Sequence, residues 1–304
     1  MSNGAVGSLR QLIACIETAE GTIPAAPAWK EIPTTGGSGI TIGFGTVESA
    51  VIRSDQQTPL PGQGNKAIGL NIPVEFAYGW MDDLLESLFR AAFNTNVLLN
   101  GTTRKAFTFE EGFTDIDQYR VGHGFIAHRG KLSLRQGAKV SGSFDLLGLV
   151  SDAWAQASIA TSFTAAAEKE TFGTYLGSIL EGGSAFSGIQ SLDVDIDGKG
   201  SHKYELFMQE PSFNSLGRIK ITGSMTTYFK DVVVANKFLA GTPTSISFTL
   251  TDPAGNDLLF ELLHIRYTGE SKTISEDDVP VTFPFAAGVD PVSGKMIRIT
   301  RTAA

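Results

Sequence analysis

Two adjacent aspartates, Asp82 and Asp83, stand where a strand-like stretch runs into a helical one. Paired carboxylates at such a join could act as a general acid and base, or they could start the helix by accepting hydrogen bonds from its free N–H groups. Asp83 and Glu86 have the spacing of a capping box, although Ser or Thr is the usual first member. No His, Lys or metal-ligating cluster lies nearby in sequence, so the helix start is the favoured interpretation.

A second acidic series, Asp193, Asp195 and Asp197 followed by Gly198, matches the first half of a calcium-binding loop. Such a loop needs a glutamate at its twelfth position, where this chain has Tyr204 and the glutamate comes one position late. The aspartates alternate with apolar residues, which predicts a strand with one acidic face. We therefore predict no metal site here.

The remaining reactive residue types form no recognisable site. The glycine-rich stretch 61–69 lacks the Gly-Lys-Ser/Thr ending of a phosphate-binding loop and the dinucleotide-binding spacing. No Gly-x-Ser-x-Gly elbow occurs, and the single cysteine, Cys15, has no catalytic context. Packing or surface roles are favoured for the histidines, because no Cys or carboxylate stands at metal-ligand spacing from them. We expect no catalytic residue, no metal and no cofactor; the four histidines are His123, His128, His202 and His264.

The composition is that of a globular, β-rich chain with an acidic balance. Of its 304 residues 42% are hydrophobic and only 18% are charged, with 34 Gly and 20 Phe, and this mix favours strands and turns over long helices. The formal net charge of −8 disfavours sequence-independent binding of nucleic acid, whose phosphates carry the same sign. No stretch approaches the roughly 18 apolar residues of a membrane helix, and the first apolar run is too short for a signal-peptide core. We expect no membrane partner.

Apolar periodicity and Pro/Gly punctuation divide the chain into five parts. The proline-rich start predicts an extended arm. Two strand-rich units follow, each with one helix, and a segment rich in Ala, Ser and Thr connects them. The expected parts are the arm (1–39), the first unit (40–150, helix 82–93), the connecting segment (151–187), the second unit (188–289, helix 231–239) and a tail (290–304).

Two stretches of the first unit have distinct patterns. Arg53–Gly69 is polar and rich in Pro and Gly, which predicts a long exposed loop. In 70–78 apolar and polar residues alternate, which predicts a half-buried strand.

The two units repeat one order of features. Both 69–95 and 218–242 hold an alternating strand that ends in a tyrosine, then an aspartate at the turn and a short apolar helix. Both 105–148 and 246–288 hold a Phe-Thr strand, an acidic turn, a long strand and a last strand that ends in glycine. We infer two copies of one strand-rich unit within the chain.

Several stretches carry a resemblance to a known family. VESAVIRSDQQTP, NIPVEFAYGWMDDLLESLF, GHGFIAHRGKLSLRQGAKVSGSFDLLG and GRIKITGSMTTYFKD resemble the major tail tube proteins of long-tailed, siphovirus-type bacteriophages, and ETAEGTIPAAPAW is similar to the arm with which these proteins often begin. The resemblance covers most of the chain, and its motifs are structural. It implies a mainly β protein with a few short helices, a tail-tube-type β-sandwich or half-barrel, to which the repeat adds internal duplication. It also implies rings of subunits that stack into a tube, the conduit for DNA ejection.

The matching positions suggest which residues meet other subunits. The loop would reach a neighbouring subunit or the next ring, the strands 70–78 and 218–227 would line the channel, and the helices would pack outside the sheet. The candidate residues are Arg53, Asp55, Gln57, Pro59, Gln63 and Lys66 in the loop, Glu17, Thr22, Pro24 and Trp29 in the N-terminal arm, and Asn71 and Glu75 on the channel-wall strand.

The resemblance also implies an assembly and its partners. Because each chain would supply two units, trimeric rings with pseudo-sixfold symmetry are favoured over hexameric ones. The expected partners are further copies of the chain, a tape measure protein in the lumen, the tail terminator and the baseplate or distal tail proteins. DNA would pass an acidic wall without specific binding. The expected location is the virion tail, after assembly in the host cytoplasm.

Two other classes of function remain as alternatives. A carbohydrate-binding or adhesin-like β-sandwich would present an aromatic platform, but Trp29, Trp80 and Trp154 fall in the arm, a strand–helix corner and the connecting segment. A hydrolase would need a charged cluster that the sequence does not offer. The structural role without enzymatic activity is therefore favoured.

Overall fold

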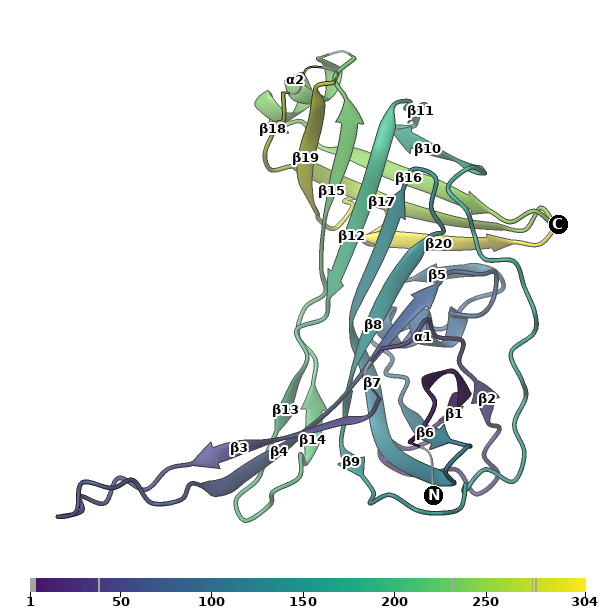
Figure 1. Cartoon of the computed structure of the whole chain (residues 1–304). Helices are drawn as coiled ribbons and strands as arrows, with labels where there is room; N and C mark the ends of the chain where they lie inside the picture. The colour runs from purple at the N-terminus through teal and green to yellow at the C-terminus, as the bar shows by residue number, and fades with distance from the viewer. Residues whose placement is uncertain (1–3, 38, 231, 275, 277) are drawn as a thin grey trace.

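The computed structural model describes residues 4–37, 39–230, 232–274, 276 and 278–304. All of its strands except β13 and β14, which pair with each other, join into one large antiparallel sheet that does not close into a barrel and folds over into two layers (Figure 1). The helices are short, so the expected mainly β sandwich is confirmed. Among the described residues no helix has the length and apolarity needed to cross a membrane.

One layer, here called the wall, is a row of six antiparallel strands in the order β4–β8–β7–β12–β15–β19. Along each strand buried apolar residues alternate with polar ones, because neighbouring side chains point to opposite faces of the sheet. The wall therefore has one apolar face and one polar face. Its strands are β4 (Gly62–Glu75), β7 (Gln118–Arg135), β8 (Ser141–Gly148), β12 (Ile189–Asp197), β15 (Lys220–Tyr228) and β19 (Pro280–Ala287), with β3 (Thr41–Val47) beyond β4 and β18 (Ser271–Lys272) beyond β19.

The second layer covers the apolar face of the wall. The long strand β7 belongs to both layers, since its first half pairs with β6 and its second half with β8. β17 likewise pairs with β16 and then with β19. The further elements are η1 (Gly7–Leu9), β1 (Arg10–Ile16), β2 (Lys30–Glu31), β5 (Val97–Leu99), β6 (Phe107–Phe113), β9 (Val150–Ser151), β10 (Gly177–Glu181), β11 (Ser184–Ala185), β13 (Ser201–Lys203), β14 (Phe213–Ser215), β16 (Thr244–Thr251), β17 (Asp257–Tyr267) and β20 (Ile297–Thr302).

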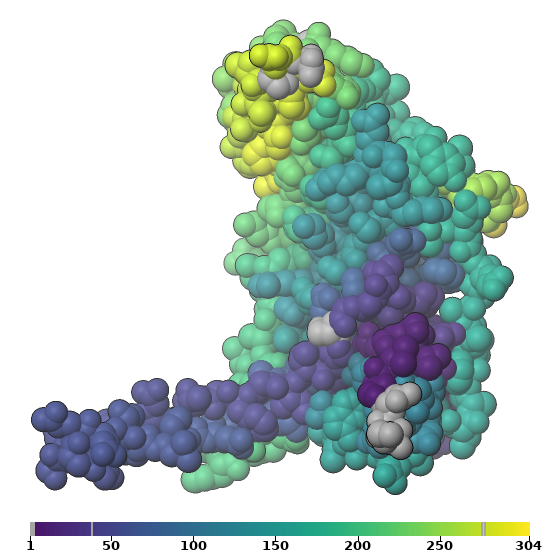
Figure 2. Space-filling view, in the orientation of Figure 1, coloured from purple at the N-terminus to yellow at the C-terminus, as the bar shows by residue number. Residues whose placement is uncertain are grey.

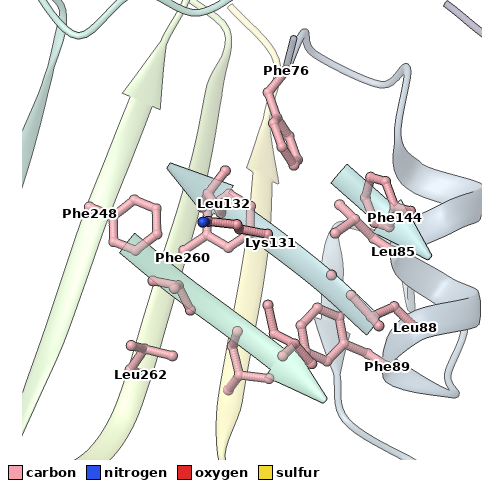
Figure 3. A pocket seen from close by; sticks show the side chains of 14 residues that line it. Phe76, Leu85, Leu88, Phe89, Lys131, Leu132, Phe144, Phe248, Phe260 and Leu262 are labelled. Carbon is pink, nitrogen blue, oxygen red and sulfur yellow. The ribbon is translucent and has the colours of Figure 1, made fainter. Parts of the chain in front are cut away.

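The two halves of the chain share one hydrophobic core. The helix α1 (Asp82–Phe89) sets Leu85 and Leu88 against Phe144 of the wall, and Phe248 and Phe260 from the second half complete the layer (Figure 3). The remaining gap in this core measures about 20 Å³ and has an apolar lining, so it is a packing space with no room for a ligand.

The strand pairings of the second half repeat those of the first. The first half has the order β1–β6–β7–β8–β4–β3, and the second half has β10–β16–β17–β19–β15–β12, with every pair antiparallel. Ile72 lies opposite Phe144 across β4 and β8, and Met225 lies opposite Phe283 across β15 and β19. The helices occupy the same place in this order, because α1 follows β4 and α2 (Val233–Leu239) follows β15.

Residues 10–16 of the expected N-terminal arm are part of the body of the protein. They form β1, which pairs with β6 over its whole length. The four residues 12–15 are buried in succession, since other structure covers both faces of this strand. The predicted C-terminal tail likewise contains β20, which pairs with β17 and β5 and buries Ile297 and Ile299.

The connecting segment wraps around the first half as a strap (residues 152–176). The Trp154 ring lies 5.9 Å from that of Phe113, the Thr164 N–H donates to the carbonyl of Trp29, and Phe172 is fully buried. After the strap the predicted connecting segment continues into β10, which pairs with β16.

The helices are shorter than predicted. α1 ends at Phe89 because Arg90 adopts a left-handed φ of 55°. The described part of the second helix begins at Val233; Asp231, its expected first residue, lies outside the described residues.

Candidate assembly interface

The acidic join at the start of α1 is an ion-pair cluster. Lys105 lies 2.6 Å from Asp83 and 2.5 Å from Glu86, and Arg301 pairs with Asp82. Burial alone would raise the pKa of Asp83. The hydrogen bonds and positive charges of Lys105 and Lys30 outweigh burial, so the pKa of Asp83 lies below its ordinary value. The capping-box prediction is wrong, because the residue at the cap, Met81, makes no side-chain bond to the helix. With each carboxylate paired, the join is a structural corner.

The acidic series of β12 lies on a strand, as predicted. Asp193 pairs with Arg135 at 2.7 Å and accepts a hydrogen bond from Ser133 at 2.8 Å. Asp197 pairs with Lys199 at 2.7 Å, and this hydrogen bond lowers its pKa to about 2. Within the described ranges no group of three His, Cys, Asp or Glu side chains could hold a metal ion.

The histidines and the cysteine have structural surroundings. His123 lies 3.2 Å from Asp152, and His202 lies 2.8 Å from Asn214. Burial lowers the pKa of His128 and raises the pKa of Cys15 to about 11. None of these side chains is set as a nucleophile–base pair.

The most prominent feature of the surface is a long hairpin (residues 41–69), which projects from the body (Figures 1 and 2). Its tip (residues 48–61) exposes Val51, Ile52 and Leu60 to 69%, 97% and 95%. Clustered apolar side chains on a projecting segment mark a surface that meets another protein.

A bidentate ion pair stiffens this tip. Arg53 donates from Nε and Nη2 to the carboxylate of Asp55 at 2.9 and 2.5 Å, which lowers the pKa of Asp55. The Gln57 N–H also donates to Asp55 at 3.3 Å, and Pro59 lies nearby in the chain. These four residues of the predicted loop therefore lie at the tip.

The other two predicted loop residues are not in a loop. Gln63 and Lys66 belong to β4, where they lie opposite Thr46 and Phe44 of β3. The prediction of a loop from 53 to 69 is therefore wrong after residue 61. A two-stranded hairpin that leaves the body has water on both faces, so its sequence need not alternate.

A short hairpin (residues 201–215) supports the base of the long one. The Lys66 N–H donates to the carbonyl of Gln209 at 2.8 Å, and the Tyr204 hydroxyl donates to the carbonyl of Lys66 at 3.0 Å. The short hairpin exposes apolar side chains that were not predicted from the sequence. The run 206–208, which lies between Glu205 and Glu210, could have indicated them. They are Leu206, Phe207, Met208 and Phe213.

The four candidate residues near the N-terminus divide into two pairs. Glu17 is buried and accepts hydrogen bonds from the Thr108 hydroxyl and the Gly124 N–H, and Trp29 is buried beside Cys15. Thr22 is exposed and Pro24 half-buried, so their contact with another subunit stays a prediction.

The polar face of the wall contains Asn71 and Glu75. Asn71 donates to Asp145 at 2.6 Å, and Thr171 of the strap donates to Glu75 at 3.1 Å. The acidic wall expected from the net charge is not seen on this face, because basic residues of β7 and β15 stand opposite the acidic ones. The acidic residues are Glu75, Asp145, Asp193, Asp195 and Asp197, and the basic ones are Arg129, Lys131, Arg135 and Lys220.

Comparison with known proteins adds one finding. A family model described as phage tail tube protein matches residues 7–287, a range that contains both sets of repeated strands. No curated protein matches the chain.

Proposed function

Because the chain belongs to the phage tail tube protein family and is thus a structural, self-assembling component of the virion tail, we propose that three copies close into a ring with pseudo-sixfold symmetry and that such rings stack into the tube. The repeated strand order carries this proposal, since each chain supplies two similar wall units. Three chains would then place six units around one axis.

Open sheet edges favour ring closure. Among the described strands β3 pairs with β4 alone, and β18 at the other end pairs with β19 alone. An exposed edge is a template for pairing with another chain, and a closed ring removes it.

We propose that the polar face of the wall lines the channel. Its opposite charges nearly cancel and alternate from one strand to the next, as in the row Asp145, Arg129, Asp197 and Lys220 across β8, β7, β12 and β15. DNA sliding past such a face would release few counterions, so it would pass without specific binding. Asn71 and Glu75 then stand in the channel wall.

The long hairpin is proposed as the contact to a neighbouring subunit or the next ring. Its exposed apolar tip would be covered by that contact, and the exposed side chains of the short hairpin would extend the same surface. Thr22 and Pro24 are proposed to join this interface.

The tube's other partners follow from its place in the tail. We propose a tape measure protein in the lumen, the tail terminator at one end, the baseplate or distal tail proteins at the other, and assembly in the host cytoplasm. The proposed role includes no catalysis. A carbohydrate-binding role has no support from the fold, since Trp29 is buried and Trp154 packs between Phe113 and Arg120.

Electron microscopy and native mass spectrometry of the purified protein test this function. Hollow rings or tubes with a ring mass of three chains are expected. A ring of six chains would refute the trimer and its pseudo-symmetry. Dispersed monomers at high concentration would refute the assembly itself.

A further inference from the structure

The two halves of the chain meet in the wall at one strand pair, here called the internal joint. β12 of the second half pairs antiparallel with β7 of the first, and Asp195 lies opposite Lys131 while Asp197 lies opposite Arg129. The Gly198 N–H continues the ladder to the carbonyl of His128 at 2.6 Å. Even-numbered residues of β12 therefore turn their backbone groups toward β7, and Asp195 and Asp197 occupy the non-hydrogen-bonded positions.

The strand β3 is the counterpart of β12. Thr41 lies opposite Gly69 of β4, and Gly69 lies opposite Leu147 of β8. In the second half Asp195 lies opposite Thr222 of β15, which lies opposite Ala286 of β19. Leu147 and Ala286 correspond, because each stands three residues after the matched Phe144 and Phe283. Thr41 thus takes the place of Asp195, and Gly43 that of Asp197.

The end of β17, with β18, is the counterpart of the second half of β7. Lys131 lies opposite Ser143 of β8, and Ser271 lies opposite Thr282, which corresponds to Ser143. Arg129 lies opposite Asp145, and the Thr268 N–H donates to the carbonyl of the corresponding Pro284 at 2.8 Å. Ser271 thus takes the place of Lys131, and Thr268 that of Arg129.

We propose that the internal joint is the template for the joint between chains: β3 of one copy pairs antiparallel with residues 268–271 of the next copy, Thr41 opposite Ser271 and Gly43 opposite Thr268, with one extra residue of 268–271 accommodated as a β-bulge. This inference rests on the proposed ring and names the residues at which it closes. The occupant of each edge is a second copy of this chain, because the chain already makes the same pairing with itself.

Both edges are open to this pairing in the isolated chain. Thr41, Thr268 and Ser271 are exposed. The ladder would begin at Thr41, because the neighbouring Ile40 N–H already donates to Glu111 at 3.0 Å.

The two kinds of joint differ in chemistry. Acidic residues face basic ones across the internal joint, and the Arg129–Asp197 distance is 3.6 Å. The joint between chains would instead face Thr41 and Gly43 with two hydroxyl residues, Ser271 and Thr268. The joint within a chain, which is permanent, thus contains ion pairs. The proposed joint between chains, which forms on assembly, contains uncharged residues.

Disulfide cross-linking tests the register. Non-hydrogen-bonded antiparallel pairs bring their Cβ atoms near enough for a disulfide. We expect rings of the Thr41→Cys/Ser271→Cys variant, after oxidation, to give cross-linked dimers and trimers of the chain on a denaturing gel without reductant. The native Cys15 is buried and should not contribute.

Two matched variants serve as controls. Lys131→Cys/Asp195→Cys should form a disulfide within one chain, so the protein should still run as a single chain on the gel. Ile42→Cys/Ser271→Cys should not cross-link, because a shift of one residue turns the side chain to the other face of the sheet. Intact rings of the Thr41→Cys/Ser271→Cys variant with no cross-link between chains would overturn this inference and leave the proposed function standing, whereas a wild-type protein without rings would refute the proposed function.

A charge exchange tests the same contact without cysteines. Thr41→Asp/Ser271→Asp should abolish rings, because two carboxylates would face each other across the joint. Thr41→Asp/Ser271→Lys copies the internal pair Asp195–Lys131 and should restore them. Equal assembly of the two double variants would overturn the register.

Discussion

Lys66 of β4 and Glu210 of the short hairpin form an ion pair of 2.8 Å that fixes the base of the long hairpin to the rest of the body. The Lys66 side chain is only 13% exposed. The backbone bond to Gln209 and the hydroxyl of Tyr204 hold the same point. The direction in which the long hairpin projects is therefore set by side chains far away in sequence.

The first prediction concerns this base. Lys66→Met should lower the free energy of unfolding by about 1 kcal/mol or less, because one partner of the ion pair is partly exposed and the backbone bonds remain. The yield of tubes should fall more clearly, since the tip would lose its fixed direction. Thermal unfolding and particle counts by electron microscopy measure the two effects. Lys139→Met, which breaks the exposed contact with Glu170, is the control; equal tube yields for both variants would contradict the prediction.

The second prediction concerns the tip. Replacement of residues 50–60 by a short Gly-Ser link should leave the monomer folded, because the tip contributes nothing to the core, and should prevent tube formation. Circular dichroism and electron microscopy are the measurements. Val289→Ser/Val292→Ser changes two exposed apolar residues elsewhere and should assemble normally. Normal tubes from the shortened protein would show that the tip is dispensable.

The local pattern of the sequence was sufficient for the strand 70–75 and for α1. Alternation identified which residues of β4 are buried, and the apolar pattern after the aspartates identified the short helix. Both signals arise from contacts within a few residues along the chain. The order of features along the sequence also indicated two repeated units, and the corresponding strand pairs β4–β8 and β15–β19 are present in the structure.

The misjudged elements depend on distant partners. The place of β1 in the body could not be read from its own residues, because its partner β6 follows about a hundred residues later. Asp83 and Asp82 form ion pairs with Lys105 and Arg301 instead of capping the helix, and Arg301 lies near the other end of the chain. The support at the base of the long hairpin could likewise not be predicted, because no local sequence pattern indicates that Lys66 and Glu210 form an ion pair.

The third prediction is a pH dependence at the internal joint. The hydrogen bond from Lys199 lowers the pKa of Asp197 to about 2, against about 3.9 in an unfolded chain. A depressed native pKa contributes stability above the unfolded value, and this contribution is lost as the pH falls from about 4 to about 2. Asp197→Asn should therefore lower the thermal midpoint at pH 7 and lose less than the wild type between pH 4 and pH 2.5. Parallel curves for the two proteins over that interval would contradict the assignment.

The fourth prediction tests which face lines the channel. Asn71→Lys/Thr222→Lys places lysines opposite Asp145 and Asp195 on the polar face and gives that face a basic excess. If this face lines the channel, tubes of the variant should bind short double-stranded oligonucleotides that enter the open ends, and the binding should weaken steeply between about 50 and 200 mM salt, because each neutralised phosphate releases counterions. Wild-type tubes should bind little. Glu168→Lys adds the same charge to the exposed strap and is the matched control. Fluorescence anisotropy of labelled oligonucleotides measures the binding, and equal affinity for the two variants would exclude the polar face as the channel wall.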